Sequence, residues 1–201
     1  MRITVFGLAL VLLLSAQAAN APVDKEKMLG SATAPVTLEI FSSFDCPHCS
    51  MMHQTVLPPL MHDFVIPGKV CVVSREFPLS GPGHPWAREA ANYATAAARI
   101  GKYDVVADAL FKNQMTWVMN GKVWETVAAV LTPSEQAKVQ ALAKDPGVQA
   151  EVQRDLDAGT AAGITSTPST IVVTRGKRSV PIAGMQNYEL FKQYLNGLLA
   201  H

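Results

Sequence analysis

The chain has 201 residues, with 17 Lys and Arg against 16 Asp and Glu, and it contains three cysteines. This balanced charge gives no electrostatic reason to expect nucleic acid or an anionic membrane surface as a partner. Three cysteines are too few for a disulfide scaffold, so an ordinary hydrophobic core must hold the chain together. Its length is within the range of a single domain.

The first residues have the order of a secretory signal: Arg2, a run over 3–14 that is apolar except for Thr4, and then small residues with an A-x-A pattern. The apolar run is shorter than the roughly 20 residues that a transmembrane helix needs. We therefore expect a signal peptide over residues 1–19, cleaved after Ala18 or Ala19. Uncleaved anchoring is the alternative.

After this leader, residues 20–34 mix small, charged and proline residues and predict a mobile N-terminal segment. Short β-rich runs then alternate with long stretches of helical composition. The predicted elements are, in order, a strand at 36–41, a helix from Cys46 or Pro47 that bends at Pro58-Pro59 and continues towards Phe64, a strand at 70–77, helices at 87–100, 103–117, 123–131, 133–143 and 147–161, strands at 169–173 and 180–182 around a turn at 175–177, and a helix at 188–199.

The most informative stretch is Cys46-Pro47-His48-Cys49, because it puts two thiols, two residues apart, at a strand-to-helix junction. A thiolate at a helix N-terminus faces unpaired backbone N–H groups and the positive end of the helix dipole, so its pKa falls. Cys46 has this exposed position, and Cys49, one turn later, is expected to be more buried. The helix dipole supplies only about 0.3 to 2 kcal/mol, and we expect His48 to add to it.

The same residues allow other interpretations. Cys46, Cys49 and His53 are soft metal ligands, but a closed zinc site needs a fourth ligand, and the sequence offers none at a suitable spacing. Haem attachment would require histidine where Ser50 stands. Cys71 lies in an apolar strand and is expected to be a small buried hydrophobe.

Four landmarks occur in a fixed order along the chain. They are Phe-x-Cys-Pro-His-Cys, the segment Arg75-Glu76-Phe77-Pro78-Leu79, a long helical stretch, and Gly163-Ile164-x-x-Thr167-Pro168. In this respect the chain resembles the DsbA-like branch of the thioredoxin superfamily. The resemblance implies an α/β thioredoxin fold, in which a central mixed β-sheet is flanked by helices. It divides the chain into a first thioredoxin-like part at 35–83, an inserted all-helical domain at 84–162 and a second thioredoxin-like part at 163–201.

The resemblance also implies a second part of the site, at Thr167 and Pro168. In this family a cis-proline packs beside the cysteine pair, and the residue before it offers backbone groups to an extended substrate strand. The residues between the cysteines also bear on function. Family members similar to thioredoxin itself carry Gly-Pro there and are reductants, whereas Pro47-His48 points towards an oxidant.

A proton relay is harder to locate. Thioredoxin-like proteins often place a buried acid six positions before the first cysteine, and here that position is Ile40. Glu39 lies one residue earlier and would point to the opposite face of a strand. An extra residue in the loop 42–45 would restore Glu39 to the relay position. We therefore expect Glu39 to serve as the relay or the relay acid to be absent.

Together these features predict a periplasmic thiol:disulfide oxidoreductase that donates its Cys46–Cys49 disulfide to reduced exported polypeptides. A membrane-bound redox partner is expected to reoxidise it. The protein is expected to be a monomer and to need no cofactor or metal. Two alternatives stay open: a disulfide reductase or isomerase of the same fold, and a non-enzymatic metal-binding module.

Overall fold

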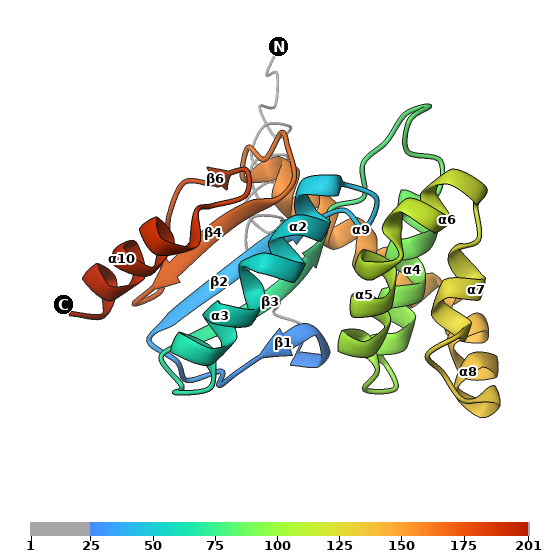
Figure 1. The fold of residues 1–201 in the computed structure, drawn as a ribbon, viewed down its shortest axis with the longest axis horizontal. Helices are drawn as coiled ribbons and strands as arrows, with labels where there is room; N and C mark the ends of the chain where they lie inside the picture. Colours follow the sequence, from blue (N-terminus) through green and yellow to red (C-terminus); the bar gives the residue numbers. More distant parts are fainter. Residues whose placement is uncertain (1–24, 201) are drawn as a thin grey trace, which may run out of the picture.

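The computed structural model describes residues 25–200, so the predicted signal peptide lies outside the described residues. A mixed β-sheet forms the centre, with the strand order β1-β3-β2-β4-β5 and with β6 paired to β4 (Figure 1). Strand β2 is parallel to β3 and antiparallel to β4, which confirms the predicted mixed sheet. The strands are β1 (Met28–Leu29), β2 (Val36–Ser42), β3 (Val70–Glu76), β4 (Ser169–Thr174), β5 (Lys177–Arg178) and β6 (Ile182–Ala183).

One face of the sheet is covered by α2 (Pro47–Thr55), α3 (Leu57–Leu60) and α10 (Tyr188–Leu199). A short π-helical segment, Met61–Val65, continues α3. Alternate residues of each strand point to this face. The apolar residues buried on this face include Val36, Leu38, Leu60, Phe64, Val172, Phe191 and Leu195.

Helix α9 (Pro146–Ala161) covers the opposite face of the sheet (Figure 1). It closes over Phe41 and Phe77, whose rings meet edge to face with centroids 6.3 Å apart. Gly159 permits this close approach, because a Cβ there would lie 2.7 Å from the Phe77 ring. The predicted insertion 84–162 is therefore not a separate unit throughout, since its last helix packs on the sheet.

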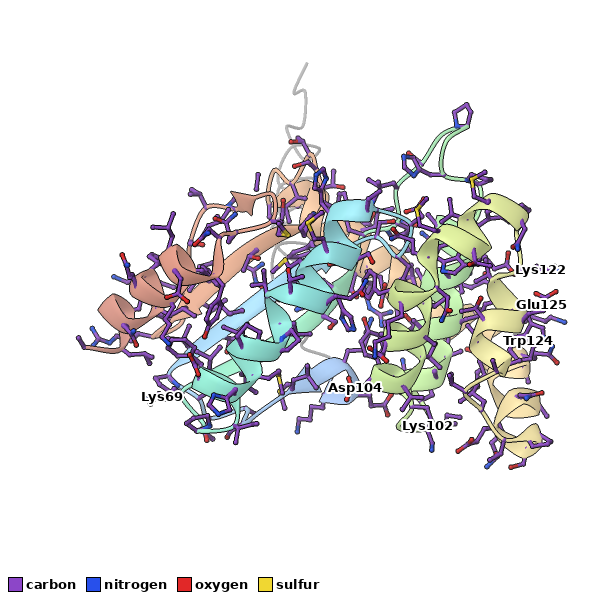
Figure 2. The ribbon with its side chains drawn as sticks, in the orientation of Figure 1. Lys69, Lys102, Asp104, Lys122, Trp124 and Glu125 are labelled. Atoms are coloured by element: carbon purple, nitrogen blue, oxygen red, sulfur yellow. The ribbon has the colours of Figure 1, made fainter. Side chains whose placement is uncertain are left out.

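The remaining helices form a layer beside the sheet: α4 (Ala87–Ala98), α5 (Tyr103–Lys112), α6 (Gln114–Asn120), α7 (Val123–Ala128) and α8 (Pro133–Ala143). The alanines of α4 let neighbouring helices approach closely, and Trp117 is fully buried among them. Trp124 lies on the outer helix α7 (Figure 2), where its ring packs against Tyr93 with centroids 5.2 Å apart. Among the described residues, no helix is both long and apolar enough to cross a membrane.

The prediction that residues 20–34 form a mobile segment is wrong for residues 25–29. Residues 20–24 lie outside the described residues. Lys25–Lys27 form a 3₁₀ turn, and β1 pairs antiparallel with the outer edge of β3. Lys27 is only 2% exposed, and its ammonium lies 2.9 Å from Asp155 and 3.0 Å from Glu151 of α9. Ion pairing and strand pairing, neither visible in the composition, order this part of the segment.

Two predicted elements are interrupted. The helix expected at 103–117 breaks at Asn113, whose side-chain amide donates to the Ala109 carbonyl oxygen and separates α5 from α6. The strand expected at 180–182 is displaced, so that only β6 pairs with β4 there. Pro181 lacks the N–H that a regular ladder requires.

Candidate active site at the N-terminus of α2

The cysteine pair lies where β2 ends and α2 begins. Cys46 is the N-cap residue of α2 with extended backbone angles, and Pro47 occupies the first helical position. Proline is favoured at that position because its missing N–H has no helical partner. Pro47 and His48 are exposed, so the turn between the two thiols faces solvent. The predicted start of this helix at Cys46 or Pro47 is confirmed.

Cys46 is a free thiol in this structure, and its Sγ donates to the Thr167 carbonyl oxygen at 3.3 Å. The pKa of Cys46 is lowered to about 5, mainly because the Cys49 thiol donates a hydrogen bond to the thiolate. Burial raises this pKa, while the Thr167 side chain and the backbone N–H groups of Cys49 and His48 lower it further. The helix N-terminus therefore acts through identifiable N–H donors.

Cys49 lies one turn into α2 and is 2% exposed. Burial raises the pKa of the Cys49 thiol well above its usual range, and the neighbouring Cys46 raises it further. Cys46 itself is 6% exposed, so the expected exposed attacking position is in fact largely covered. The pair is distinguished by the ionisation of its two thiols more than by their accessibility.

Thr167 and Pro168 come from far along the chain and lie beside this pair, immediately before β4. The Thr167–Pro168 peptide bond is cis, as predicted. The hydrogen bond from Cys46 to the Thr167 carbonyl oxygen joins the two parts of the site. The fold thus brings together all the residues of the cysteine motif and the Thr-Pro pair.

Glu39 is not brought to this site. Ile40 and Ser42 of β2 line the cavity next to Cys49, so Glu39 points to the opposite face of the sheet. There it lies 2.7 Å from Arg75 and 2.5 Å from Arg178, and it is buried. No extra residue changes the alternation of the strand, and the structure gives Glu39 an ion-pairing position and not one beside Cys49.

A polar pair next to the nucleophile, formed by a buried aspartate and a partly exposed histidine, was missed from the sequence. Asp45, beside Cys46, is 7% exposed, and one of its oxygens lies 2.6 Å from Nδ1 of His84. Its other oxygen accepts a hydrogen bond from Ser43 at 2.5 Å. These contacts hold the loop around residues 80–86 against the start of α2. The sequence places Asp45 next to Cys46 but gives no sign of a partner 39 residues away.

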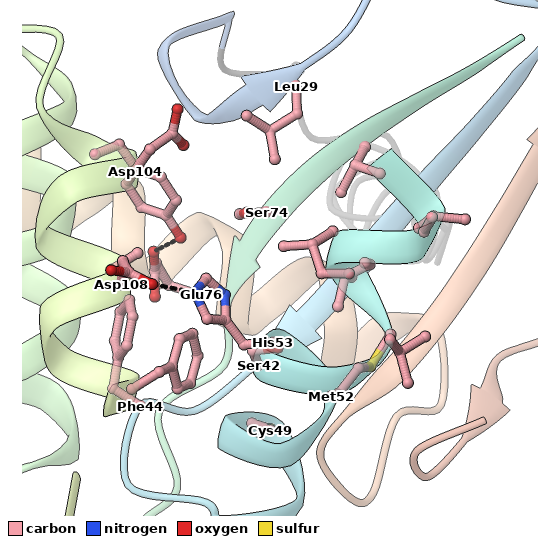
Figure 3. Close-up of a pocket in the computed structure, with 18 residues that line it drawn as sticks. Leu29, Ser42, Phe44, Cys49, Met52, His53, Ser74, Glu76, Asp104 and Asp108 are labelled. Atoms are coloured by element: carbon pink, nitrogen blue, oxygen red, sulfur yellow. Dashed lines mark hydrogen bonds and ion pairs between the residues drawn. The ribbon is translucent and has the colours of Figure 1, made fainter. Parts of the chain in front are cut away.

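A cavity of about 300 Å³ lies behind the cysteine pair, between α2, α3 and α5 (Figure 3). Cys49 and Phe44 form part of its wall near the active site. His53, considered above as a metal ligand, faces this cavity and lies 3.4 Å from Asp108. Within residues 25–200 no three His, Cys, Asp or Glu side chains are grouped so that they could hold a metal ion.

Comparison with known proteins identifies the family of this chain and several relatives. A thioredoxin family model matches residues 23–195. A putative protein-disulfide oxidoreductase from Rickettsia bellii is 24% identical over 57% of this chain, which spans 45% of that relative's length. A probable disulfide bond formation protein D from Bacillus cereus is 27% identical over 73% of this chain and 69% of the relative.

The fold also matches a solved structure. Alpha-DsbA1 of Wolbachia pipientis superposes with a TM-score of 0.75 at 22% sequence identity, covering 89% of this chain and 93% of the other. At that identity the match establishes the fold. Because the family model covers most of the sequence, the chain belongs to the thioredoxin family.

Proposed function

We propose that this protein is a protein-disulfide oxidoreductase that works as a dithiol oxidase. In the proposed reaction a substrate thiolate attacks Cys46 Sγ, the Cys46–Cys49 bond breaks, and Cys49 leaves with the electron pair. A second substrate thiolate then attacks the substrate sulfur of the mixed disulfide. Cys46 departs as a thiolate, so two electrons pass from the substrate to the protein.

The observation that carries this proposal is the opposite ionisation of the two thiols. A pKa of about 5 makes Cys46 a good leaving group at neutral pH, and the buried Cys49 stays protonated in the reduced protein. Thr167 and the cis-Pro168 lie beside Cys46, and the Thr167 backbone is proposed to hold an extended substrate strand.

The pKa of Cys46 also bears on the direction of the proposed reaction. Lowering the Cys46 pKa from 9.0 to about 5 stabilises the reduced form. At pH 7 this stabilisation is about 3 kcal/mol, which raises the reduction potential by roughly 60 mV. The pKa of Cys46 also falls between the values of about 7 for thioredoxin and about 3.5 for DsbA. This favours an oxidase over a reductase.

The site of action and the partners belong to the same proposal. The leader over residues 1–19 supports export, and the periplasm would supply reduced, newly exported polypeptides as substrates. The name of the Bacillus cereus relative refers to disulfide bond formation, which is consistent with this proposal. Each turnover leaves the protein reduced, so a membrane-bound redox partner is proposed to reoxidise it.

The reduction potential of the Cys46–Cys49 pair tests the direction. We expect a value nearer the −120 mV of DsbA than the −270 mV of thioredoxin, measured by equilibration with glutathione buffers. The protein should also restore activity to a reduced, disulfide-requiring substrate with glutathione as the only recharging agent. A potential near −270 mV would show that the protein is a reductase.

The assignment of the two cysteines is tested by trapping. Cys49→Ser removes the thiol that releases substrate from Cys46, so disulfide-linked adducts should accumulate and disappear on reduction. Cys71→Ser is the matched control, because Cys71 is a buried cysteine in β3, away from the pair, and should trap nothing. Adducts on a Cys46→Ser variant would contradict the assignment of Cys46 as the attacked residue.

A further inference from the structure

Glu76, the last residue of β3, is a buried carboxyl group that the proposed dithiol exchange does not yet use. Its side chain is 2% exposed. Val72, Ser74 and Glu76 all line the cavity behind the active site, because alternate residues of β3 point to the α2 face of the sheet. Cys49 lines the same cavity, as Figure 3 shows.

The register of the sheet explains why this carboxyl reaches the cavity when Glu39 does not. Glu76 pairs with Ser42 in the parallel ladder between β3 and β2, and Ser42 also lines the cavity. Ile40 occupies the position where an acid was sought in the sequence, on the same face of β2. Strand β3 therefore provides a carboxyl group on the face where β2 presents Ile40.

The groups around Glu76 set its ionisation. Tyr103 of α5 donates a hydrogen bond from its hydroxyl to Glu76 Oε1 at 2.9 Å. Burial raises the pKa of Glu76 to about 7, Lys27 and Tyr103 oppose this rise, and Asp155 and Glu151 of α9 add to it. The carboxyl consequently exists in both protonation states near neutral pH.

The opposite wall of the cavity, formed by α2 and α5, carries further titratable groups. His53 of α2 lies 3.4 Å from Asp108 of α5, and Asp104 is one turn earlier on that helix. Burial lowers the pKa of His53 and raises that of Asp104. Most residues that line the cavity are apolar, but its volume of about 300 Å³ leaves room beside these polar groups for several water molecules, each of which needs about 30 Å³.

We propose that Glu76 exchanges a proton with Cys49 through water in this cavity. The inference rests on the dithiol exchange proposed above, although not on its direction. Cys49 is cut off from bulk solvent and holds its proton tightly. A buried acid that titrates near neutrality is suited to deliver or remove that proton.

When a substrate thiolate attacks Cys46, a substrate–Cys46 bond forms, the Cys46–Cys49 bond breaks, and the electron pair stays on Cys49 as a thiolate. The Glu76 carboxyl gives its proton to that thiolate through water and becomes a carboxylate. In the reverse step the Glu76 carboxylate takes the proton from Cys49, and the resulting Cys49 thiolate attacks the mixed disulfide on Cys46.

The reverse step can be isolated by mixing the reduced protein with oxidised glutathione. Attack by Cys46 depends on the glutathione concentration, whereas resolution by Cys49 does not. In the wild type the resolution rate should rise as Glu76 ionises, with an inflection near pH 7. Glu76→Gln should slow resolution by about tenfold or more and abolish the inflection. The rate of the first step should change less than about twofold.

Two further variants separate proton exchange from a structural role. Tyr103→Phe keeps the carboxyl but removes a hydrogen bond that lowers its pKa, so the inflection should move to higher pH. Glu39→Gln is the matched control, because it removes a buried carboxylate from the other face of the sheet and should keep the inflection.

Failure of the dithiol function and failure of the proton exchange give different experimental results. If reduced wild-type protein formed no mixed disulfide with glutathione, the dithiol function itself would be wrong, and this inference with it. If the wild type reacted but Glu76→Gln kept both the resolution rate and the inflection near pH 7, the proton exchange alone would be overturned. An unshifted inflection in Tyr103→Phe would overturn it as well, even if Glu76→Gln did not fold.

Discussion

At the scale of single residues, the chemistry of Cys46 depends mainly on its partner thiol. The donated hydrogen bond from Cys49 is the largest cause of the lowered pKa, ahead of the backbone groups of α2. Cys49 therefore has two roles in the proposed reaction: it resolves mixed disulfides, and it stabilises the Cys46 thiolate.

This dependence can be tested by titrating the Cys46 thiolate, through its absorbance or its rate of alkylation, in reduced protein. We expect an inflection near pH 5 in the wild type. Cys49→Ala removes the donor and should raise the pKa of Cys46 by about one unit or more. Cys49→Ser keeps a hydroxyl donor and should raise it less. Equal pKa values for the two variants would contradict the role assigned to the Cys49 thiol.

The residues of the site differ in how well the sequence predicts them. Cys46, Cys49 and Pro168 belong to short motifs whose chemistry is local, and the structure brings them together. For Glu39 the sequence left two alternatives open, and the regular alternation along β2 places its side chain on the face away from Cys49. His84 could not be paired with Asp45, since that contact depends on the path of a loop.

At the scale of the element, α2 supplies fixed donors to Cys46. The backbone N–H groups of His48 and Cys49 point at the thiolate and lower its pKa. The exposed His48 side chain is predicted to tune the thiol, and the structure shows that the backbone N–H of His48 also lowers the pKa of Cys46. Removing the N–H and removing the imidazole are therefore different experiments.

Replacing Pro47-His48 by Gly-Pro removes the N–H at position 48, and the glycine relieves the crowding that precedes a proline. The pKa of Cys46 should then rise towards the value of about 7 found in thioredoxin. His48→Ala keeps the N–H and removes only the imidazole, so it measures the contribution of the side chain. If His48→Ala raised the pKa as far as the double substitution, the imidazole and not the helix N-terminus would be the main donor.

Prediction of elements succeeded where the pattern is local and failed where tertiary contacts intervene. Helix α8 begins at Pro133, as predicted, and a capping box of Thr132 and Glu135 stabilises its first turn. Strand β1 is only two residues long and exists because β3 has a free edge beside it. After β5 the backbone and hydroxyl of Ser179 both bond to Val172, which continues the hairpin without a regular strand.

At the scale of the whole molecule, a buried ion-pair network joins the N-terminal segment, the sheet and α9. Asp155 of α9 accepts from Lys27 at 2.9 Å and from Arg75 at 2.9 Å, and it also accepts from the backbone N–H of Glu76. Arg75 continues the network to Glu39. Three segments far apart in the sequence thus depend on one carboxylate.

Asp155→Asn removes the negative charge at the centre of this network and leaves two buried cations with less compensation. We expect the free energy of unfolding to fall by about 3 kcal/mol, measured by urea denaturation. Asp157→Asn on the same helix is the control, because Asp157 is exposed and should change stability by less than about 0.5 kcal/mol. Equal effects of the two substitutions would show that the network contributes little.

The redox state of the pair should also be visible in the stability of the whole protein. The oxidised form has no Cys46 thiol, whereas in the reduced form folding lowers the pKa of that thiol from 9.0 to about 5. A depressed pKa stabilises the folded state at high pH and loses that effect as the pH falls through the folded value. The stabilisation of the reduced form should therefore be absent below pH 5, grow between pH 5 and 9, and be complete above pH 9.

Between those limits the free energy of unfolding of the reduced protein, relative to the oxidised protein, should rise by about 1.4 kcal/mol per pH unit. Urea unfolding of both forms at pH 5, 6, 7 and 8 measures this slope, and groups that titrate alike in both forms cancel in the difference. Cys46→Ala, which lacks the thiol, should lose the slope relative to the reduced wild type. A difference that stayed constant over this range would mean that the thiolate of Cys46 is not stabilised by the fold, and the driving force for disulfide donation would have to be sought elsewhere in the molecule.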